Sequence, residues 1–249
     1  MKQIKTLTAL FAVFFLLGIS PQVCASHAMA QLLLAEEGTE CDHSYSYGFC
    51  TLCGEPQADY VVPGTDGYYN LGNAHEFLWW SKAVASGTTN ASARLTADID
   101  MEGIAMVPVG ATEQAPFRGT FDGQGHVIQN LELTGENKIG LFSYVTGGAY
   151  VKNFILDSSC SISGGSYVGT IGCTIGNGSV NIEGIGMEGT VTASSVNAGG
   201  ILGCRLDNTA ILMSDCYVTG KVIGGSESAA MAGWVGSGAK LTNLWACGE

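Results

Sequence analysis

The feature that most constrains this chain is a glycine-centred pattern that recurs in its second half. The segment Gly140-Leu141-Phe142-Ser143-Tyr144 is matched by three later segments that begin at Gly169, Gly200 and Gly233, at intervals of 29, 31 and 33 residues. A second β-prone stretch follows each copy, and no unit has a helical period long enough for a crossover helix. Ankyrin and tetratricopeptide repeats need helices, and a propeller blade needs about 40–50 residues. The pattern therefore predicts a β-solenoid, whose coils stack and bury one inward row of side chains.

Stacked coils place equivalent residues about 4.8 Å apart. We therefore expect Leu141, Ile171, Ile201 and either Val235 or Trp234 to form an apolar ladder inside the coils. Glycine suits the corners, where φ can be positive and neighbouring backbones crowd. Composition agrees, because 36 of the 249 residues are Gly, 46% are hydrophobic and only 13% are charged. A disordered chain would combine low hydrophobicity with high net charge, so that class is excluded.

The N-terminus has the pattern of a secretory signal peptide. Lys2 and Lys5 precede an apolar run from Leu7 to Ile19, and small residues follow. Cleavage is expected after Ala25 or, alternatively, after Ala30. The run of 13 residues is shorter than the about 20 that a membrane-spanning helix needs. We expect a secreted or cell-surface protein with no membrane span after cleavage.

The charge of the chain excludes one class of partner. The formal net charge is −12, and removal of the signal peptide would take away two lysines and no acid. Nucleic-acid binding needs a basic patch that neutralises phosphates, so nucleic acid is not an expected partner. An acidic surface also argues against binding to anionic membranes.

One helix is predicted before the repeats. Asn73 is a good N-cap, Glu76 stands three residues later as in a capping box, and Gly87 ends the pattern. The apolar stripe at helical spacing consists of Phe77, Trp80, Val84 and, at its edge, Ala83. We expect this helix to cap the N-terminal end of the solenoid, where a bare core would otherwise be exposed. The Trp79–Trp80 pair suits core packing better than a sugar-stacking surface.

A longer pattern carries a family resemblance. The strings Leu95-Thr96-Ala97-Asp98-Ile99-Asp100, Val107-Pro108-Val109-Gly110 and Phe117-Arg118-Gly119-Thr120-Phe121-Asp122-Gly123-Gln124-Gly125-His126 precede the glycine repeats. Together they resemble the GLUG-motif proteins over roughly residues 68–249. The resemblance implies a right-handed parallel β-helix, an extracellular or envelope location, and an accessory or adhesive role.

The resemblance transfers no catalytic residue. Related repeats occur in IgA-cleaving metallopeptidases, whose zinc signature is His-Glu-x-x-His. Here His75-Glu76 is followed by Phe77, Leu78 and Trp79, so the second histidine is missing. The zinc-protease activity of those relatives is therefore not expected in this chain.

Four parts follow along the chain: a signal peptide (1–25), a linker with a small Cys/His module (26–60), the N-terminal cap and entry segment (61–137), and GLUG-like repeats (138–249). The fourth repeat is expected to be incomplete at the C-terminus. The fold class is all-β, with one N-terminal capping helix.

The sharpest chemical motif is Cys41-x-His43-x6-Cys50-x2-Cys53. Three thiolates and one imidazole make a complete tetrahedral zinc set, and a site closed by four protein ligands is structural. The alternative is disulfide chemistry between Cys41 and Cys50 or Cys53, because exported proteins meet oxidants. His43 is the residue that favours zinc or another soft metal.

Cys173 and Cys204 occupy equivalent positions in successive copies of the repeat. Their expected spacing of about 4.8 Å falls inside the Cα range of a disulfide, about 4.4–6.8 Å. The alternative is two buried thiols that act as small apolar residues of the ladder. Both remain open.

We expect a binding, adhesive or scaffold module at the cell surface, with a host or bacterial glycan or protein as partner and no catalytic residue. The alternative is a glycan-active β-helix enzyme of polysaccharide lyase or hydrolase type, which needs clustered acids and a basic residue. Its candidates would be Asp98, Asp100, Asp122 and Arg118. Convergence of these residues in one groove would favour the enzyme.

Overall fold

The structure, a computed structural model, describes residues 41–247. The chain divides into two units, Met1–His43 and Ser44–Glu249, and only residues 41–43 of the first belong to the described part. The predicted signal peptide and both of its predicted cleavage sites lie outside the described residues.

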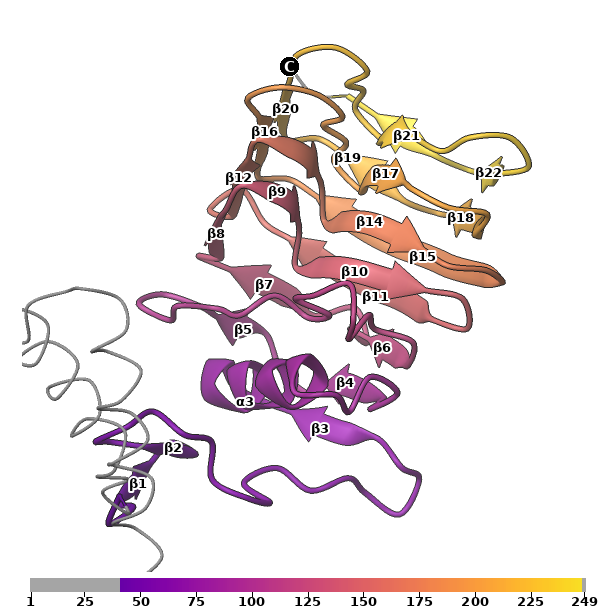
Figure 1. Ribbon diagram of the computed structural model, residues 1–249. Helices are drawn as coiled ribbons and strands as arrows, with labels where there is room; N and C mark the ends of the chain where they lie inside the picture. The colour runs from indigo at the N-terminus through magenta and orange to yellow at the C-terminus, as the bar shows by residue number, and fades with distance from the viewer. Residues whose placement is uncertain (1–40, 248–249) are drawn as a thin grey trace, which may run out of the picture. The chain divides into compact units, whose positions relative to one another are not determined.

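The second unit is a parallel β-solenoid of about 5 turns, as predicted (Figure 1). The long sheet consists of β3 (Tyr69–Leu71), β4 (Ala93–Leu95), β6 (Thr120–Asp122), β11 (Tyr150–Leu156), β15 (Ser179–Met187), β18 (Ala210–Ser214) and β22 (Lys240–Thr242). It is extended by β5 (Ile99–Asp100), β7 (Val127–Gln129), β19 (Tyr217–Val218) and β23 (Trp245–Ala246).

Two further sheets of four strands each complete the coils from β8 onward (Figure 1). The second sheet consists of β10 (Phe142–Thr146), β14 (Ile171–Ile175), β17 (Leu202–Arg205) and β21 (Ala232–Trp234). The third sheet consists of β8 (Glu132–Thr134), β12 (Ser161–Gly164), β16 (Thr190–Ala193) and β20 (Lys221–Ile223). Between the third and second sheets, β9 (Asn137–Ile139) pairs with β13 (Ser166–Val168).

The strand register confirms the first three copies of the repeat and corrects the fourth. Phe142 pairs with Ile171, and Ile171 pairs with Leu202, as the first two intervals predict. Leu202, however, pairs with Ala232. Gly233 therefore stands at the second glycine of the motif and not at the first, so the predicted interval of 33 residues is wrong.

The apolar ladder of the second sheet also differs from the prediction. It follows the paired positions Phe142, Ile171, Leu202 and Ala232. Leu141 and Ile201 are fully buried in the same core, one residue earlier in their coils. Val235 is half-buried and Trp234 is 50% exposed, so neither continues the ladder, because the fourth copy is in a different register.

The predicted helix is α3 (Ala74–Ala85). The Asn73 side chain accepts hydrogen bonds from two backbone N–H groups of the first turn, at 3.0 and 3.1 Å. The Glu76 carboxylate accepts from the Gly72 N–H at 2.7 Å, one residue before the position that a capping box would use. Gly87 follows the helix with φ +115°, a conformation that favours glycine.

The helix α3 seals the core of the first coil, beside β3 and β4 (Figure 1). Its rings continue an aromatic column whose neighbouring centroids lie 5.2–6.3 Å apart. The column consists of Phe77, Trp80, Phe117, Phe121, Phe142 and Phe154. Trp79 is also buried, and its indole N–H donates to the carbonyl of Gln57 at 2.7 Å. The Trp79–Trp80 pair is therefore core, as predicted, and not a sugar-stacking surface.

Two rows of residues with positive φ bend the coils at equivalent points. One row bends the long sheet and consists of Asn153, Gly184, Asp215 and Asn243, with φ between 51° and 62°. The other bends the chain before the second sheet and consists of Lys138, Tyr167, Asn197 and Glu227. Most of these positions hold no glycine. The motif glycines instead have ordinary φ and lie where neighbouring backbones leave no room for a side chain. A Cβ on Gly169, for example, would lie 2.6 Å from the Gly199 carbonyl oxygen.

Candidate functional site

The Cys/His module is built on a short hairpin. Strand β1 (Tyr45–Ser46) pairs with antiparallel β2 (Phe49–Cys50). The turn residues Tyr47 and Gly48 have φ of 51° and 80°, the combination that a tight type I′ turn requires. Residues just before β1 and just after β2 consequently meet at the same end of the hairpin.

Cys50 and Cys53 form a knuckle at that end. The backbone N–H of Leu52 points at the Cys50 sulfur, with N···S 3.4 Å. The N–H of Gly54 donates to the Cys50 carbonyl at 2.9 Å, and Gly54 has φ +74°. Glycine permits this conformation at little cost. The turn thus directs two sulfur ligands toward one point, as the Cys-x2-Cys-Gly pattern predicts.

The four predicted ligands come together. One ligand atom each of Cys41, His43, Cys50 and Cys53 lies within 4.8 Å of all the others. Zinc–sulfur bonds of about 2.3 Å in a tetrahedron put ligand atoms about 3.8 Å apart, so small side-chain rotations would close this cluster around an ion. Cys50 is buried, Cys41 is half-buried, and His43 and Cys53 are exposed. The cluster could therefore bind a metal with protein ligands alone, and the disulfide alternative stays open.

Cys173 and Cys204 stack in register, as predicted. They form a small apolar cluster with Ile175, Tyr144 and Tyr167, separate from the main core. Both are thiols in this structure, and burial raises the pKa of Cys173 to about 12 and that of Cys204 to about 11. A disulfide between them remains a prediction.

Two acids considered for the enzyme alternative hold turns. Asp98 accepts hydrogen bonds from the Val127 N–H and from His126, both at 3.0 Å, and these bonds lower the pKa of Asp98. Asp100 accepts from the Asn130 side chain at 2.8 Å, and this bond lowers the pKa of Asp100. Each carboxylate thus tethers its own coil to the next one.

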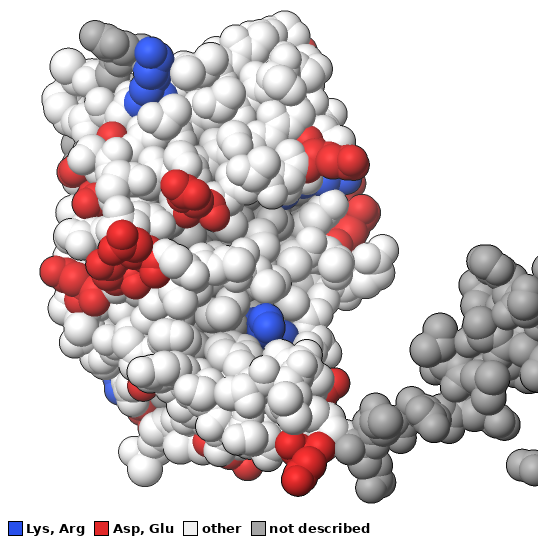
Figure 2. Space-filling model, turned by 90° about the vertical axis from the view of Figure 1, so that its left-hand side faces the viewer, with Lys and Arg blue, Asp and Glu red and all other residues white. Residues whose placement is uncertain are grey.

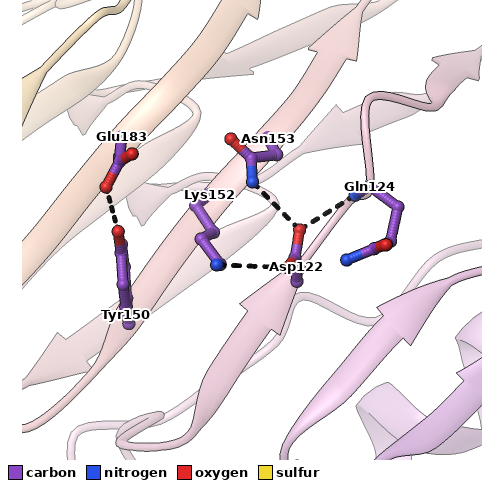
Figure 3. Close-up of polar contacts among 6 residues, drawn as sticks. All are labelled: Asp122, Gln124, Tyr150, Lys152, Asn153 and Glu183. Carbon is purple, nitrogen blue, oxygen red and sulfur yellow. Dashed lines mark hydrogen bonds and ion pairs between the residues drawn. The ribbon is translucent and has the colours of Figure 1, made fainter.

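The third acid, Asp122, lies on the outward side of the long sheet, where Figure 3 shows it bonded to three neighbours. Its carboxylate is 3.2 Å from the Lys152 ammonium and accepts from the Asn153 side chain at 3.2 Å and the Gln124 N–H at 3.0 Å. Burial raises the pKa of Asp122, but these bonds outweigh it and the net shift is downward. Each of the three acids therefore has hydrogen-bond partners of its own, and none of the ion pairs within residues 41–247 includes Arg118.

The same outward side holds two tyrosine–glutamate pairs that the sequence analysis missed. Tyr150 donates to Glu183, as Figure 3 shows, and Tyr217 donates to Glu188 at 2.7 Å. The Glu183 bond raises the pKa of Tyr150 to about 12, and burial together with Glu188 raises the pKa of Tyr217 to about 12.

The register of the repeat carries a signal for part of this cluster. Asp122, Lys152 and Glu183 pair in succession across β6, β11 and β15, and therefore alternate in sign along one outward row. These charges recur at intervals of 30 and 31 residues, close to but not equal to the 29 and 31 that separate the first three motif glycines. The tyrosines carry no comparable signal, because Tyr150 and Glu183 belong to different rows.

The charge distribution fits an acidic protein. Figure 2 shows the side that carries β8 and β12 in Figure 1: Asp and Glu gather in several groups, Lys and Arg are few, and most of the face is uncharged. Among residues 41–247, no helix has both the length and the apolar character to cross a membrane.

The comparisons with known proteins give distant similarity. No family model matches the chain. The chain is 28% identical to halomucin of Haloquadratum walsbyi in an alignment 183 residues long, which covers 66% of this chain and 2% of halomucin. It therefore spans about 2% of the length of this curated relative. It is also similar to a crystal structure from Bacteroides ovatus described as a "putative immunoglobulin A1 protease". There the identity is 19%, the TM-score is 0.48, and the match covers 74% of this chain and 69% of that one.

Proposed function

We propose that this protein is an exported β-solenoid that binds a glycan or protein of a host or bacterial surface and breaks no bond. The observation that carries the proposal is the state of the acids on the outward long sheet. Asp122, Glu183 and Glu188 are each already held by a lysine or a tyrosine. A general acid–base pair needs groups whose pKa lies near the working pH. A tyrosine with a pKa of about 12 does not supply one. The resemblance to GLUG-motif proteins supports the same role.

The experiment tests location, binding and catalysis together. The full chain is produced in a bacterial host, and its access to external protease is measured on intact cells. The purified protein is then incubated with cell-wall, mucin and polysaccharide preparations. The proposal expects cleavage on intact cells, co-sedimentation with at least one preparation, and no new reducing or unsaturated sugar ends. Retention inside the cell or absence of all binding would overturn it, and new sugar ends would favour the glycan-active enzyme.

We further propose that the Cys/His module binds one structural zinc ion. The four ligand atoms lie within 4.8 Å of one another around a hairpin that already aims the knuckle sulfurs. Zinc would join the residues before β1 to those after β2 and stabilise a hairpin that is marginal by itself. A site with four protein ligands leaves no open position, so the metal would have no catalytic part.

Metal analysis of the full chain, purified under reducing conditions, tests the zinc proposal. We expect one zinc per chain, and its loss in Cys53→Ser. The matched control is Cys247→Ser, which changes an exposed cysteine outside the cluster and should keep the metal. A second preparation, made without reductant, is mapped for disulfides. Absence of zinc under reducing conditions together with a Cys41 disulfide in the second preparation would replace zinc with the disulfide alternative.

A further inference from the structure

An open groove lies on the outward side of the long sheet, where the sheet bends. Asn153 and Gly184 hold equivalent positions in β11 and β15, between the pairs Lys152–Glu183 and Phe154–Ile185, and both have positive φ. The strands change direction there. The groove has a volume of about 460 Å³, and its lining includes Gln124, Ile155 and Tyr217. This volume falls within the range of about 300–1,000 Å³ that is typical of small-molecule sites.

One wall of the groove is an aromatic ring held in place. Tyr217 leans over Gly186 of the adjacent strand, and a Cβ on Gly186 would lie 2.4 Å from the ring. The hydroxyl of Tyr217 donates to Glu188 at 2.7 Å, which fixes the ring at its far end. Glycine at position 186 therefore makes room for the ring. A ring that needs no reordering loses little entropy when a ligand stacks on it.

The rim of the groove offers two amides. Asn153 donates its Nδ2 to Asp122 at 3.2 Å, so its carbonyl oxygen faces the other way. That oxygen is 2.8 Å from where a Cβ on Gly184 would lie, and Gly184 also lines the groove. Within the described residues, the side-chain amide of Gln124 forms no hydrogen bond. Together the two amides present donors and acceptors to a ligand.

The charged side chains beside the groove are mostly acidic and disfavour binding of an anionic ligand. Lys152 is the cation of this cluster and is already paired with Asp122 at 3.2 Å. Glu183 and Glu188 add negative charge that no second cation offsets in the described contacts. An anionic ligand would meet net repulsion and find no free cation to bind it.

We infer that this groove binds a neutral saccharide, with one sugar ring stacked on Tyr217 and its hydroxyls bonded to Gln124 and Asn153. A sugar ring has an apolar C–H face and a polar edge, which match the aromatic wall and the amide rim. The inference rests on the proposed binding function, because it names the ligand class of that surface.

The test measures binding of neutral oligosaccharides (gluco-, galacto-, manno- and xylo-hexasaccharides) to the purified full chain by saturation-transfer NMR and calorimetry. We expect at least one to bind, and Tyr217→Ala to weaken its binding by about tenfold or more, the effect of losing a well-packed aromatic contact. Tyr217→Phe keeps the ring and should weaken binding less. Tyr144→Ala, which removes a tyrosine from the second sheet, is the matched control and should bind as the unchanged protein.

A second variant covers the event that Tyr217→Ala does not fold. Gln124→Gly removes the rim amide at a position with φ +54°, which glycine adopts without strain, and should also weaken binding. Binding of a polyuronate or a basic peptide alone, or neutral-sugar binding that neither variant changes, would overturn the inference and leave the proposed binding function standing. If no neutral sugar binds while the protein still co-sediments with surface preparations, the inference is again overturned alone.

Discussion

At Gly169 two coils approach so closely that a methyl group has no room. A Cβ there would lie 2.6 Å from the Gly199 oxygen and 2.7 Å from the Gly203 nitrogen, both of them backbone atoms of the next coil. Backbone cannot yield as a flexible side chain can. The glycines of the motif are therefore required for coil spacing, whereas the positions with positive φ are filled mostly by other residues.

Gly169→Ala should accordingly lower the free energy of unfolding by about 1–3 kcal/mol, the usual cost of overpacking. Gly64→Ala is the control, because the nearest atom to its Cβ would be the Asp66 carboxylate oxygen at 3.0 Å, the end of an exposed side chain, and its other contacts would lie at the ordinary distances of 3.6 and 3.7 Å. Urea unfolding of the two variants measures the difference. Equal stability of both variants would contradict the crowding argument.

The tyrosine–glutamate pairs predict a late alkaline titration. Tyr150 and Tyr217 have a pKa of about 12 in the fold and an ordinary value of 10.0 when unfolded. The stability that they contribute is therefore fully present below pH 10 and is lost as the pH rises through 12. Ultraviolet absorbance of tyrosinate should show these two groups titrating last.

Glu183→Gln is the control for this titration. It removes the negative charge beside Tyr150, so that Tyr150 should titrate closer to its ordinary value while Tyr217 keeps its late titration. An unchanged absorbance curve in Glu183→Gln would show that the carboxylate does not hold the Tyr150 proton.

Among the helices and strands, α3 is the one whose ends and buried face are best predicted by residues within the same segment. Asn73→Ala removes the cap of two first-turn N–H groups and should cost about 1 kcal/mol of stability. Asn73→Asp keeps a side-chain oxygen at the cap and should cost much less. Thermal unfolding followed by circular dichroism compares the two, and a similar loss in both would exclude the capping bond as the cause.

Elements with local signals were predictable from the sequence. Cap, apolar stripe and terminating glycine define α3 within one segment, and the Cys/His ligands meet because a two-residue turn joins their strands. The register of the fourth repeat was not predictable. Gly233 imitates the first glycine of the motif, and only the pairing of Leu202 with Ala232 reveals the difference.

The groove was not predictable for a related reason. Simple alternation along a strand assigns each side chain to one face. At Asn153 the positive φ breaks that alternation in the middle of β11, and the sequence does not mark the break. Tyr217 and Glu188 lie 29 residues apart, and contact between them depends on the absence of a side chain at Gly186.

At the scale of the whole solenoid, each coil contacts only its neighbours, so stability is a sum of coil and interface terms. The aromatic column runs from α3 to β11 and concentrates large buried rings in the first coils. Later coils hold smaller aliphatic core residues, and the last strands expose Trp234, Leu241 and Trp245. Stability should therefore fall along the chain toward β20–β23.

Hydrogen exchange of backbone amides tests this gradient. We expect the slowest exchange in β6, β11 and β15. The fastest exchange is expected in the last strands, β20 to β23, because local opening costs least free energy where few apolar groups are buried.

Phe121→Ala removes a ring that touches α3, β10 and β11, and should lower the free energy of unfolding by about 3–5 kcal/mol, with lost protection on both sides of β6. Val218→Ala, also fully buried but in a later coil, should affect β19 and the strands after it alone. Uniform loss of protection in Val218→Ala would mean that the solenoid opens as one unit and would refute the gradient.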